Sequence, residues 1–248
     1  MGAPATAGGE AGNYPWAKRI KAAERYADAR AGRISFAVVD EGGRLRGDHV
    51  GRGHNSHSVV KAMLLLAYLR QPEVRDRELN ESDRRLLEPM IRRSDNQTAN
   101  AVYERVGPGA LYALARDAEM KRFSTQSVWG LSQITASDQA RFFYRLERFI
   151  PQGHRGYAME LLTEVVKRQR WGIPPVAPDG WRLHFKGGWA PVSSEPGWGI
   201  NQVMLLRDPP RRFSLAVLTR YNPGKRYGIR TVRGVAKRLL RRYERFDG

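Results

Sequence analysis

The chain has 248 residues, with 43 Lys and Arg against 25 Asp and Glu, and therefore a formal net charge of +18. Its hydrophobic content of 41%, with six Trp and ten Tyr, excludes a disordered chain. Cysteine is absent, which excludes disulfides, thiolate catalysis and Cys-type zinc sites. No apolar run reaches the length of a transmembrane helix.

The positive charge predicts attraction to anionic surfaces, among which we consider cell-wall polymer, acidic lipid and nucleic acid. The arginines are spread along the whole chain and do not gather in one patch with aromatic residues. This distribution favours a bias in composition and predicts no specific nucleic-acid site. We expect a monomer that is secreted or held in the cell envelope, although a cytoplasmic location is not excluded by the absence of cysteine.

The N-terminal part begins with residues 1–14, whose small and glycine-rich composition predicts a disordered leader. An amphipathic helix is expected over Trp16–Ala31 and ends at Gly32. A strand over Ile34–Asp40, a glycine turn and a second strand near Arg44–Val50 then predict a hairpin.

The middle of the chain, residues 58–180, has the apolar spacing of helices separated by Pro and Gly clusters. The helical patterns after the first one, which opens at Ser58, are Ser82–Ile91, Gln97–Val106, Ala110–Ala118, Ser137–Phe149 and Tyr157–Lys167. The last third returns to strand patterns and closes with a helix. Its expected elements are strands at Arg182–Phe185, Ile200–Leu206 and Phe213–Thr219, turns at Gly187-Gly188 and Pro209-Pro210, and a helix from Ile229 to Phe246.

Two strands near the start and three near the end predict one five-stranded antiparallel sheet covered by the N- and C-terminal helices. The expected fold class is α/β (α+β) with two lobes. Residues 15–57 and 181–248 would form the sheet lobe, and residues 58–180 the helical lobe. Ser58 would then lie at the seam between the lobes, where clefts form.

Ser58 and Lys61 stand three residues apart at the start of an apolar helical run. Residues i and i+3 share one face of a helix, so the hydroxyl and the amine would project together. A nucleophilic serine needs a nearby base and donors for the developing oxyanion, and backbone N–H groups at a helix start are such donors. Taken alone, however, a serine before an apolar run is most often a helix cap.

Two further short motifs follow. Ser94-Asp95-Asn96 lies between two helices and alone reads as a cap, while Lys186-Gly187-Gly188 ends a strand and alone reads as a turn. In this order and context, the three motifs resemble those of class A β-lactamases and of the related penicillin-recognising acyltransferases. Asn96-Gln97-Thr98-Ala99-Asn100 is similar to the family's continuation of the second motif. The resemblance covers Ile34–Phe246.

The resemblance implies a serine hydrolase or acyltransferase that uses neither a metal nor a cofactor. Ser58 would be the acylated nucleophile and Lys61 its base, with a pKa lowered by burial beside Lys186. Ser94 would pass a proton to the leaving nitrogen. Lys186 would supply positive potential for Ser94 and for a substrate carboxylate.

The resemblance also implies a set of substrate-binding residues: Asn96, Gly187, Gly188 and Trp189. The Asn96 amide would hold the acylamide of a small-molecule or peptide-like substrate. The oxyanion hole would combine the backbone N–H groups of Ser58 and Trp189.

Three departures from the family pattern stand out. The segment Ser124–Thr135 contains no acid, whereas class A β-lactamases carry a glutamate there that activates the deacylating water. Gly187 replaces the usual Thr or Ser that binds a β-lactam carboxylate, and Glu195 adds a negative charge nearby. The segment between Ser58 and Ser94 is shorter than usual. We therefore expect an atypical member that forms an acyl-enzyme but has weak or no β-lactam turnover.

Two other functions remain open on sequence grounds. One is a degenerate, non-catalytic member of the fold that binds cell-wall or other anionic polymer, and the other is a basic protein associated with nucleic acid. His54 and His57 flank the nucleophile but lack a third ligand for a metal site. Trp181, Trp189 and Trp198 surround the third motif and predict either an aromatic substrate wall or ordinary core packing.

Overall fold

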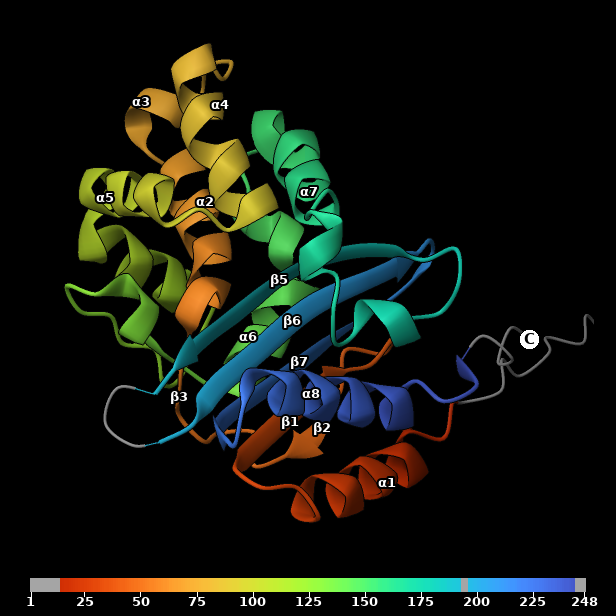
Figure 1. Ribbon diagram of the computed structural model, residues 1–248. Helices are drawn as coiled ribbons and strands as arrows, with labels where there is room; N and C mark the ends of the chain where they lie inside the picture. The colour runs from red at the N-terminus through yellow and green to blue at the C-terminus, as the bar shows by residue number, and fades with distance from the viewer. Residues whose placement is uncertain (1–13, 193–195, 244–248) are drawn as a thin grey trace, which may run out of the picture.

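A computed structural model describes residues 14–192 and 196–243. Nearly all of the expected leader, together with Glu195 and Phe246, lies outside these ranges. Within them, the chain folds as a twisted sheet with helices on both faces (Figure 1).

Five antiparallel strands form the main sheet in the order β2-β1-β7-β6-β5. Their bounds are Leu45–Asp48 (β2), Arg33–Val39 (β1), Arg211–Asn222 (β7), Trp198–Asp208 (β6) and Arg182–Pro191 (β5). The two N-terminal and three C-terminal strands thus join through the β1–β7 pair, in which Arg33 is opposite Arg220 and Val39 is opposite Ser214. The predicted fold class and sheet are confirmed.

The expected turn at Gly187-Gly188 is wrong. Both glycines lie inside β5, where Gly187 pairs with Gln202 and Gly188 with Asn201 of β6. The strand continues because β6 supplies backbone partners along its whole length, which outweighs the low strand propensity of two glycines. β5 is an edge strand of the sheet and runs past the start of the helix that carries Lys61.

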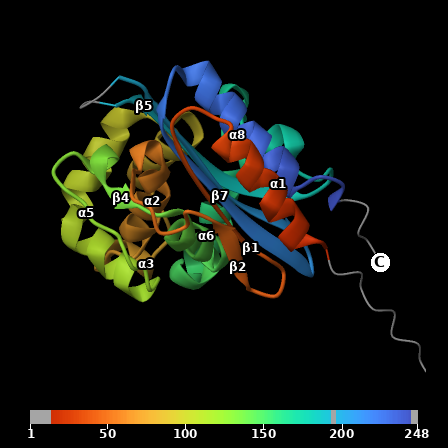
Figure 2. The same ribbon diagram turned by 90° about the horizontal axis from the view of Figure 1, so that it is seen from below.

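The terminal helices α1 (Trp16–Asp28) and α8 (Lys225–Leu239) pack against each other and cover one face of the sheet (Figures 1 and 2). The opposite face contacts α6 (Ala136–Tyr144) and α7 (Arg155–Thr163). The sheet therefore separates two hydrophobic clusters, as an antiparallel sheet buried on both faces requires.

The remaining helices gather around α2 (Lys61–Leu69), every residue of which is buried. A helix that is apolar all round belongs in a core, so α2 is the axis of the helical part. Its surroundings are α3 (Pro72–Arg75), α4 (Glu81–Glu88), the π-helical turn η2 (Pro89–Arg93) and α5 (Asn96–Asp117). The backbone of α5 leaves the helical conformation at Gly107, with φ 67° and ψ 168°, where the sequence predicted a break between two helices.

A short second sheet pairs β3 (His54–Asn55) with β4 (Gln133–Ile134), and the sequence did not predict it. The Ser56 N–H extends this pairing by donating to the Ser132 carbonyl at 2.7 Å. Two-residue strands have too little pattern to be recognised from sequence. Their pairing nevertheless anchors the loop before Ser58 to the segment 124–132.

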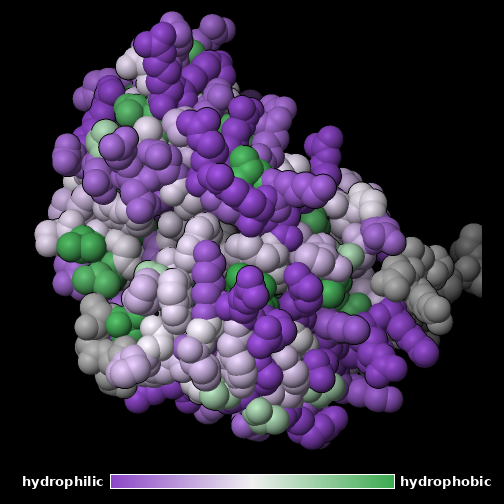
Figure 3. All heavy atoms as spheres, in the orientation of Figure 1, coloured by the Kyte–Doolittle hydropathy of each residue, from purple (hydrophilic) through white to green (hydrophobic). Residues whose placement is uncertain are grey.

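The surface is largely hydrophilic on the face that Figure 3 shows, where hydrophobic residues occur in small separate patches. Across residues 14–192 and 196–243, no helix combines the length and apolarity needed to cross a membrane.

Candidate active site

Ser58 lies in the 3₁₀ turn η1 (His57–Val60), which leads directly into α2. Its half-buried side chain is placed by close backbone packing against β5. A Cβ atom built on Gly188 would lie 2.7 Å from the Ser58 nitrogen and 2.9 Å from the Val59 nitrogen. Only glycine leaves room for this approach. The amide of Ser58 therefore lies beside the strand that carries Trp189, as an oxyanion hole made of these two residues requires.

Lys61 is fully buried, and its ammonium donates to three oxygens of the second motif. The acceptors are the Ser94 carbonyl at 2.6 Å, the Asp95 carbonyl at 2.9 Å and Asn96 Oδ1 at 2.8 Å. The loop between η2 and α5 thus wraps around the amine.

Ser94 joins the second buried lysine to the same cluster. Its hydroxyl accepts from Lys186 Nζ at 3.0 Å and lies 3.4 Å from Lys61 Nζ. Its backbone is left-handed, with φ 58° and ψ 37°, a conformation that costs energy for any residue except glycine. Ser94 closes the π-helical turn η2, and this turn directs its side chain toward β5.

The two lysines have lowered pKa values. Burial lowers the pKa of Lys61 to about 7, against a smaller opposing effect of Asp95. Burial lowers the pKa of Lys186 well below its usual range, and the charge of Lys61 adds to the effect. Two cations that share Ser94 cannot both be held without cost, so the charge of each disfavours the charge of the other.

Ser58 does not hydrogen-bond to Lys61 in this arrangement. Among the residues that the structure describes, the Ser58 hydroxyl has no hydrogen-bond partner, while Lys61 uses its three protons on the second motif. An ammonium has no lone pair to accept a proton. Lys61 must therefore lose one proton before it can accept the proton of the Ser58 hydroxyl.

Asn96 and Asp95 begin α5. The Asp95 carboxylate caps the helix by accepting from the Thr98 N–H at 2.8 Å, and this bond lowers the pKa of Asp95. Asn96 is exposed and accepts from Lys61 through its amide oxygen, which leaves the amide nitrogen to donate to a substrate.

Trp129 faces Lys61 from the segment that lacks an acid. The centre of its indole lies 4.9 Å from Lys61 Nζ, in a cation–π arrangement. Its ring nitrogen donates to Asn100 Oδ1 at 2.8 Å, and its carbonyl accepts from the Ser132 hydroxyl at 2.6 Å. The side of Lys61 nearest this segment is thus covered by an aromatic ring that cannot accept a proton from water.

Trp171 occupies the space beside Gly187. A Cβ atom on Gly187 would lie 3.0 Å and 3.2 Å from two atoms of the Trp171 ring, so the usual Thr or Ser would press against it. Trp171 also makes an edge-to-face contact with Trp189, with ring centres 5.8 Å apart. Trp181, by contrast, packs on Phe213 of the hydrophobic core, which is the second of the two alternatives that the sequence left open for it.

Sequence reasoning did not single out Trp129 or Trp171. Both reach the site through tertiary packing, and neither stands at a helical or strand spacing from a motif residue. The absence of any acid in the segment that carries Trp129 was the available signal for a changed site.

The two histidines before the nucleophile are buried. His54 Nε2 lies 2.9 Å from the Ser35 hydroxyl, and the ring of His57 fills the space above Gly199. Burial lowers the pKa of His57 to about 4, so this side chain stays neutral at neutral pH.

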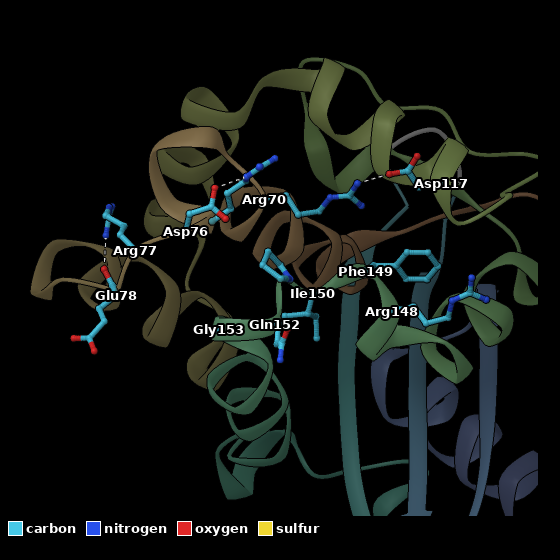
Figure 4. A pocket seen from close by; sticks show the side chains of 12 residues that line it. Arg70, Asp76, Arg77, Glu78, Asp117, Arg148, Phe149, Ile150, Gln152 and Gly153 are labelled. Atoms are coloured by element: carbon cyan, nitrogen blue, oxygen red, sulfur yellow. Dashed lines mark hydrogen bonds and ion pairs between the residues drawn. The ribbon is translucent and has the colours of Figure 1, made fainter.

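A larger cavity lies at the far end of the helical part and has a volume of about 1010 Å³ (Figure 4). Three of its arginines are engaged in ion pairs: Arg70 with Asp117, Arg75 with Asp76 and Arg77 with Asp83. None of the motif residues lines it. The site is therefore assigned to the cluster around Lys61.

Comparison with known proteins agrees with this geometry. The profile of the "Beta-lactamase enzyme family" matches residues 82–243, well over half of the chain. No curated protein sequence matches.

Solved structures show the same fold at low sequence identity. A beta-lactamase from Sphaerobacter thermophilus is 19% identical with a TM-score of 0.77, covering 92% of this chain and 98% of its own. A class A beta-lactamase from Mycobacterium abscessus is 20% identical with a TM-score of 0.75, covering 91% and 99%. An ancestral class A beta-lactamase is 18% identical with a TM-score of 0.75, covering 90% and 98%. The chain belongs to the beta-lactamase enzyme family, with the fold of its class A members.

Proposed function

We propose that this protein is a serine hydrolase or acyltransferase that is acylated at Ser58 by an amide or ester and turns over β-lactams slowly or not at all. The observation that carries the proposal is the pair of fully buried lysines, Lys61 and Lys186, joined through the hydroxyl of Ser94. Burying two amines costs free energy, which hydrogen bonds to a shared partner only partly offset. Perturbed amines beside a positioned serine are what acyl transfer needs.

Acylation would proceed in two proton transfers. Neutral Lys61 takes the proton of the Ser58 hydroxyl as Oγ forms a bond to the acyl carbonyl carbon, and the carbonyl oxygen becomes an oxyanion held by backbone N–H groups. The bond from carbon to the leaving nitrogen or oxygen then breaks. Lys61 gives a proton to the Ser94 hydroxyl as that hydroxyl gives its own to the leaving atom, so Lys61 is neutral again and the products are an ester on Ser58 and a free amine or alcohol.

Among the described residues, deacylation lacks a base bonded to Lys61. Trp129 covers Lys61 from the segment in which class A β-lactamases carry a glutamate that activates water. A water beside an indole has no proton acceptor there, so the ester on Ser58 should persist until another nucleophile, such as an amine, takes the acyl group. This reasoning supports acyl transfer or slow hydrolysis over efficient β-lactam hydrolysis.

The substrate is expected to be a small molecule with an acylamide. A cavity of about 780 Å³ adjoins Asn96 and Trp129 and is lined also by Asn100, Tyr103, Val128 and the carboxylate of Glu104. Its apolar wall and amide groups suit the acyl part of such a substrate, whose amide Asn96 would hold.

Intact-mass measurement tests the proposal. The protein and its Ser58→Ala variant are incubated with a penicillin and, separately, with a fluorophosphonate. We expect at least one of the two reagents to add a single adduct to each chain. The adduct should form on the parent protein and be absent from the Ser58→Ala variant. Absence of any Ser58-dependent adduct would overturn the proposal and favour a non-catalytic binding member of the family, for which sedimentation with insoluble peptidoglycan is the next measurement.

A further inference from the structure

A second cavity adjoins the Ser94 side of the site and has a volume of about 600 Å³. Its apolar wall consists of Trp171, Trp189 and Ile229, and its polar lining consists of Gln169 and four cations: Arg93, Arg168, Lys225 and Arg226. No acidic side chain lines it. The cavity is therefore both aromatic and strongly positive.

The cations of this cavity have no acidic ion-pair partner among the residues that the structure describes. Within residues 14–192 and 196–243, none of the four side chains forms an ion pair, whereas Arg92, next to Arg93, pairs with Glu88 and Glu164. Lys225 is held against the aromatic wall, with Nζ 4.7 Å from the centre of the Trp189 ring. Four like charges around one space repel one another, and an anion in that space would relieve the repulsion.

Two contacts connect the cavity to the chemistry. Trp171 packs on Gly187, whose carbonyl accepts from Lys186 Nζ at 3.1 Å. Gln169 donates to the Arg93 carbonyl at 2.6 Å and so fixes the residue that precedes Ser94. Since Ser94 is the proposed proton donor to the leaving atom and Asn96 the proposed holder of the acylamide, this cavity lies on the leaving-group side.

We propose that the cavity binds an oxyanion, carboxylate or phosphate, carried on a flat aromatic or apolar leaving group. The arginines suit a planar or tetrahedral oxyanion, and the indoles suit a flat body. Gly187 provides no hydroxyl for such an anion, and Trp171 fills the space that a hydroxyl there would need. Recognition of negative charge thus passes to the four cations. The assignment to the leaving group rests on the proposed function, whereas the binding itself does not.

Equilibrium binding tests the inference without requiring turnover. Isothermal titration calorimetry on the Ser58→Ala variant compares 3-hydroxybenzoate and phenyl phosphate with the neutral 3-hydroxybenzamide. We expect both anions to bind about tenfold more tightly than the amide, and the difference to shrink as sodium chloride rises from about 0.05 to 0.5 M. Whichever anion binds more tightly identifies the preferred oxyanion, carboxylate or phosphate.

Matched charge variants locate the binding. Lys225→Gln combined with Arg226→Gln should weaken anion binding about five- to tenfold and leave amide binding unchanged. Arg233→Gln combined with Lys237→Gln removes the same charge from exposed positions of α8 outside the cavity and should have little effect. Equal binding of anions and amide, or equal losses in the two double variants, would overturn the inference.

A labelling experiment keeps this inference separate from the proposed function. Esters of phenylacetylglycine with 3-hydroxybenzoate and with 3-hydroxybenzamide are offered to the protein with Ser58 intact. Acylation of Ser58 by neither ester would count against the proposed function while the binding preference still stood. Acylation by both at the same rate, without a binding preference, would overturn only the role of the cavity.

Discussion

The ammonium of Lys61 lies 4.9 Å from the centre of the Trp129 ring, while three protons of the same group point at oxygens of the second motif. One side of the amine is thus engaged by polar groups of the motif, and another is closed by an indole. This relationship separates the two halves of the proposed reaction. The lysine can serve acylation when it is neutral, but no carboxylate within residues 14–192 and 196–243 forms an ion pair with it from which to activate water.

Replacing the indole should shorten the life of the acyl-enzyme. Trp129→Ala opens the space beside Lys61 to water, so we expect the deacylation rate constant to rise about tenfold. The measurement is the decay of the acyl-enzyme mass after excess reagent is removed. Gln126→Ala, at an exposed position of the same segment outside the cavity lining, is the control and should decay as the parent does. Equal decay of all three proteins would show that Trp129 does not limit access of water.

The pH dependence of the acylation rate constant should follow the protonation of Lys61. Below pH about 7 the amine is protonated and cannot take a proton, so the acylation rate constant should rise with pH through about 7 and then level off. Lys61→Arg should remove both the activity and the rise, because a guanidinium stays protonated. A rate constant with no change between pH 5 and 9, both limits being about two units from that midpoint, would contradict the assignment.

The free energy of unfolding should also depend on the protonation of Lys61, and this contribution should rise with pH. The folded pKa of Lys61 is about 7 against an ordinary value of 10.5, so between these values the unfolded state binds more protons. Lys61 alone therefore makes folding more favourable as pH rises across that window. Urea unfolding of the protein and of Lys61→Met should show a free-energy difference that moves in favour of the lysine protein with rising pH. A constant difference would refute this.

The space beside Gly187 can be tested with a double-mutant cycle. Gly187→Thr should lower the free energy of unfolding by about 1–3 kcal/mol because the new side chain meets the Trp171 ring. In the Trp171→Ala background the same substitution should cost much less. Additive costs, measured by urea unfolding, would mean that the ring does not occupy this space.

The close approach at Gly188 should be essential for acylation. Gly188→Ala places a methyl group 2.7 Å from the Ser58 nitrogen, so the backbone of η1 or β5 must shift. We expect the Ser58 labelling rate to fall about 100-fold, as for a misplacement of about 1 Å at a reacting group. Gly156→Ala in α7, where a Cβ atom meets open space, is the control and should label normally. Normal labelling of Gly188→Ala would exclude this packing as the device that positions Ser58.

Much of the fold could be predicted because its signals are local. Short apolar runs over Ile34–Asp40 and Phe213–Thr219 indicated strands, and the apolar run after Lys61 indicated a helix. The continuation of β5 through Gly187 and Gly188 could not be predicted, since β6 imposes it through pairing. The β3–β4 pair was missed because two residues carry no period.

The site could be predicted to the extent that its residues stand in short motifs. Ser58, Lys61, Ser94, Asn96 and Lys186 were named from spacing and order, and the structure brings the last four together through the hydrogen bonds of Lys61 and Lys186. Trp129 and Trp171 were not named, because each meets its partner only after folding. Trp129 is 68 residues from Lys61 in the sequence, and Trp171 is 16 residues from Gly187. Their contacts change what the site is expected to do while leaving its motifs intact.

The lifetime of an acyl group on Ser58 tests the central claim most directly. The protein is labelled with a penicillin or an activated phenylacetylglycyl ester, freed of reagent, and followed by intact mass and peptide mapping over hours. We predict an adduct on Ser58 that persists in buffer and is released faster by an added amine acceptor. Rapid return to the unmodified mass in buffer alone, with the penicillin converted to its hydrolysed form, would contradict the account.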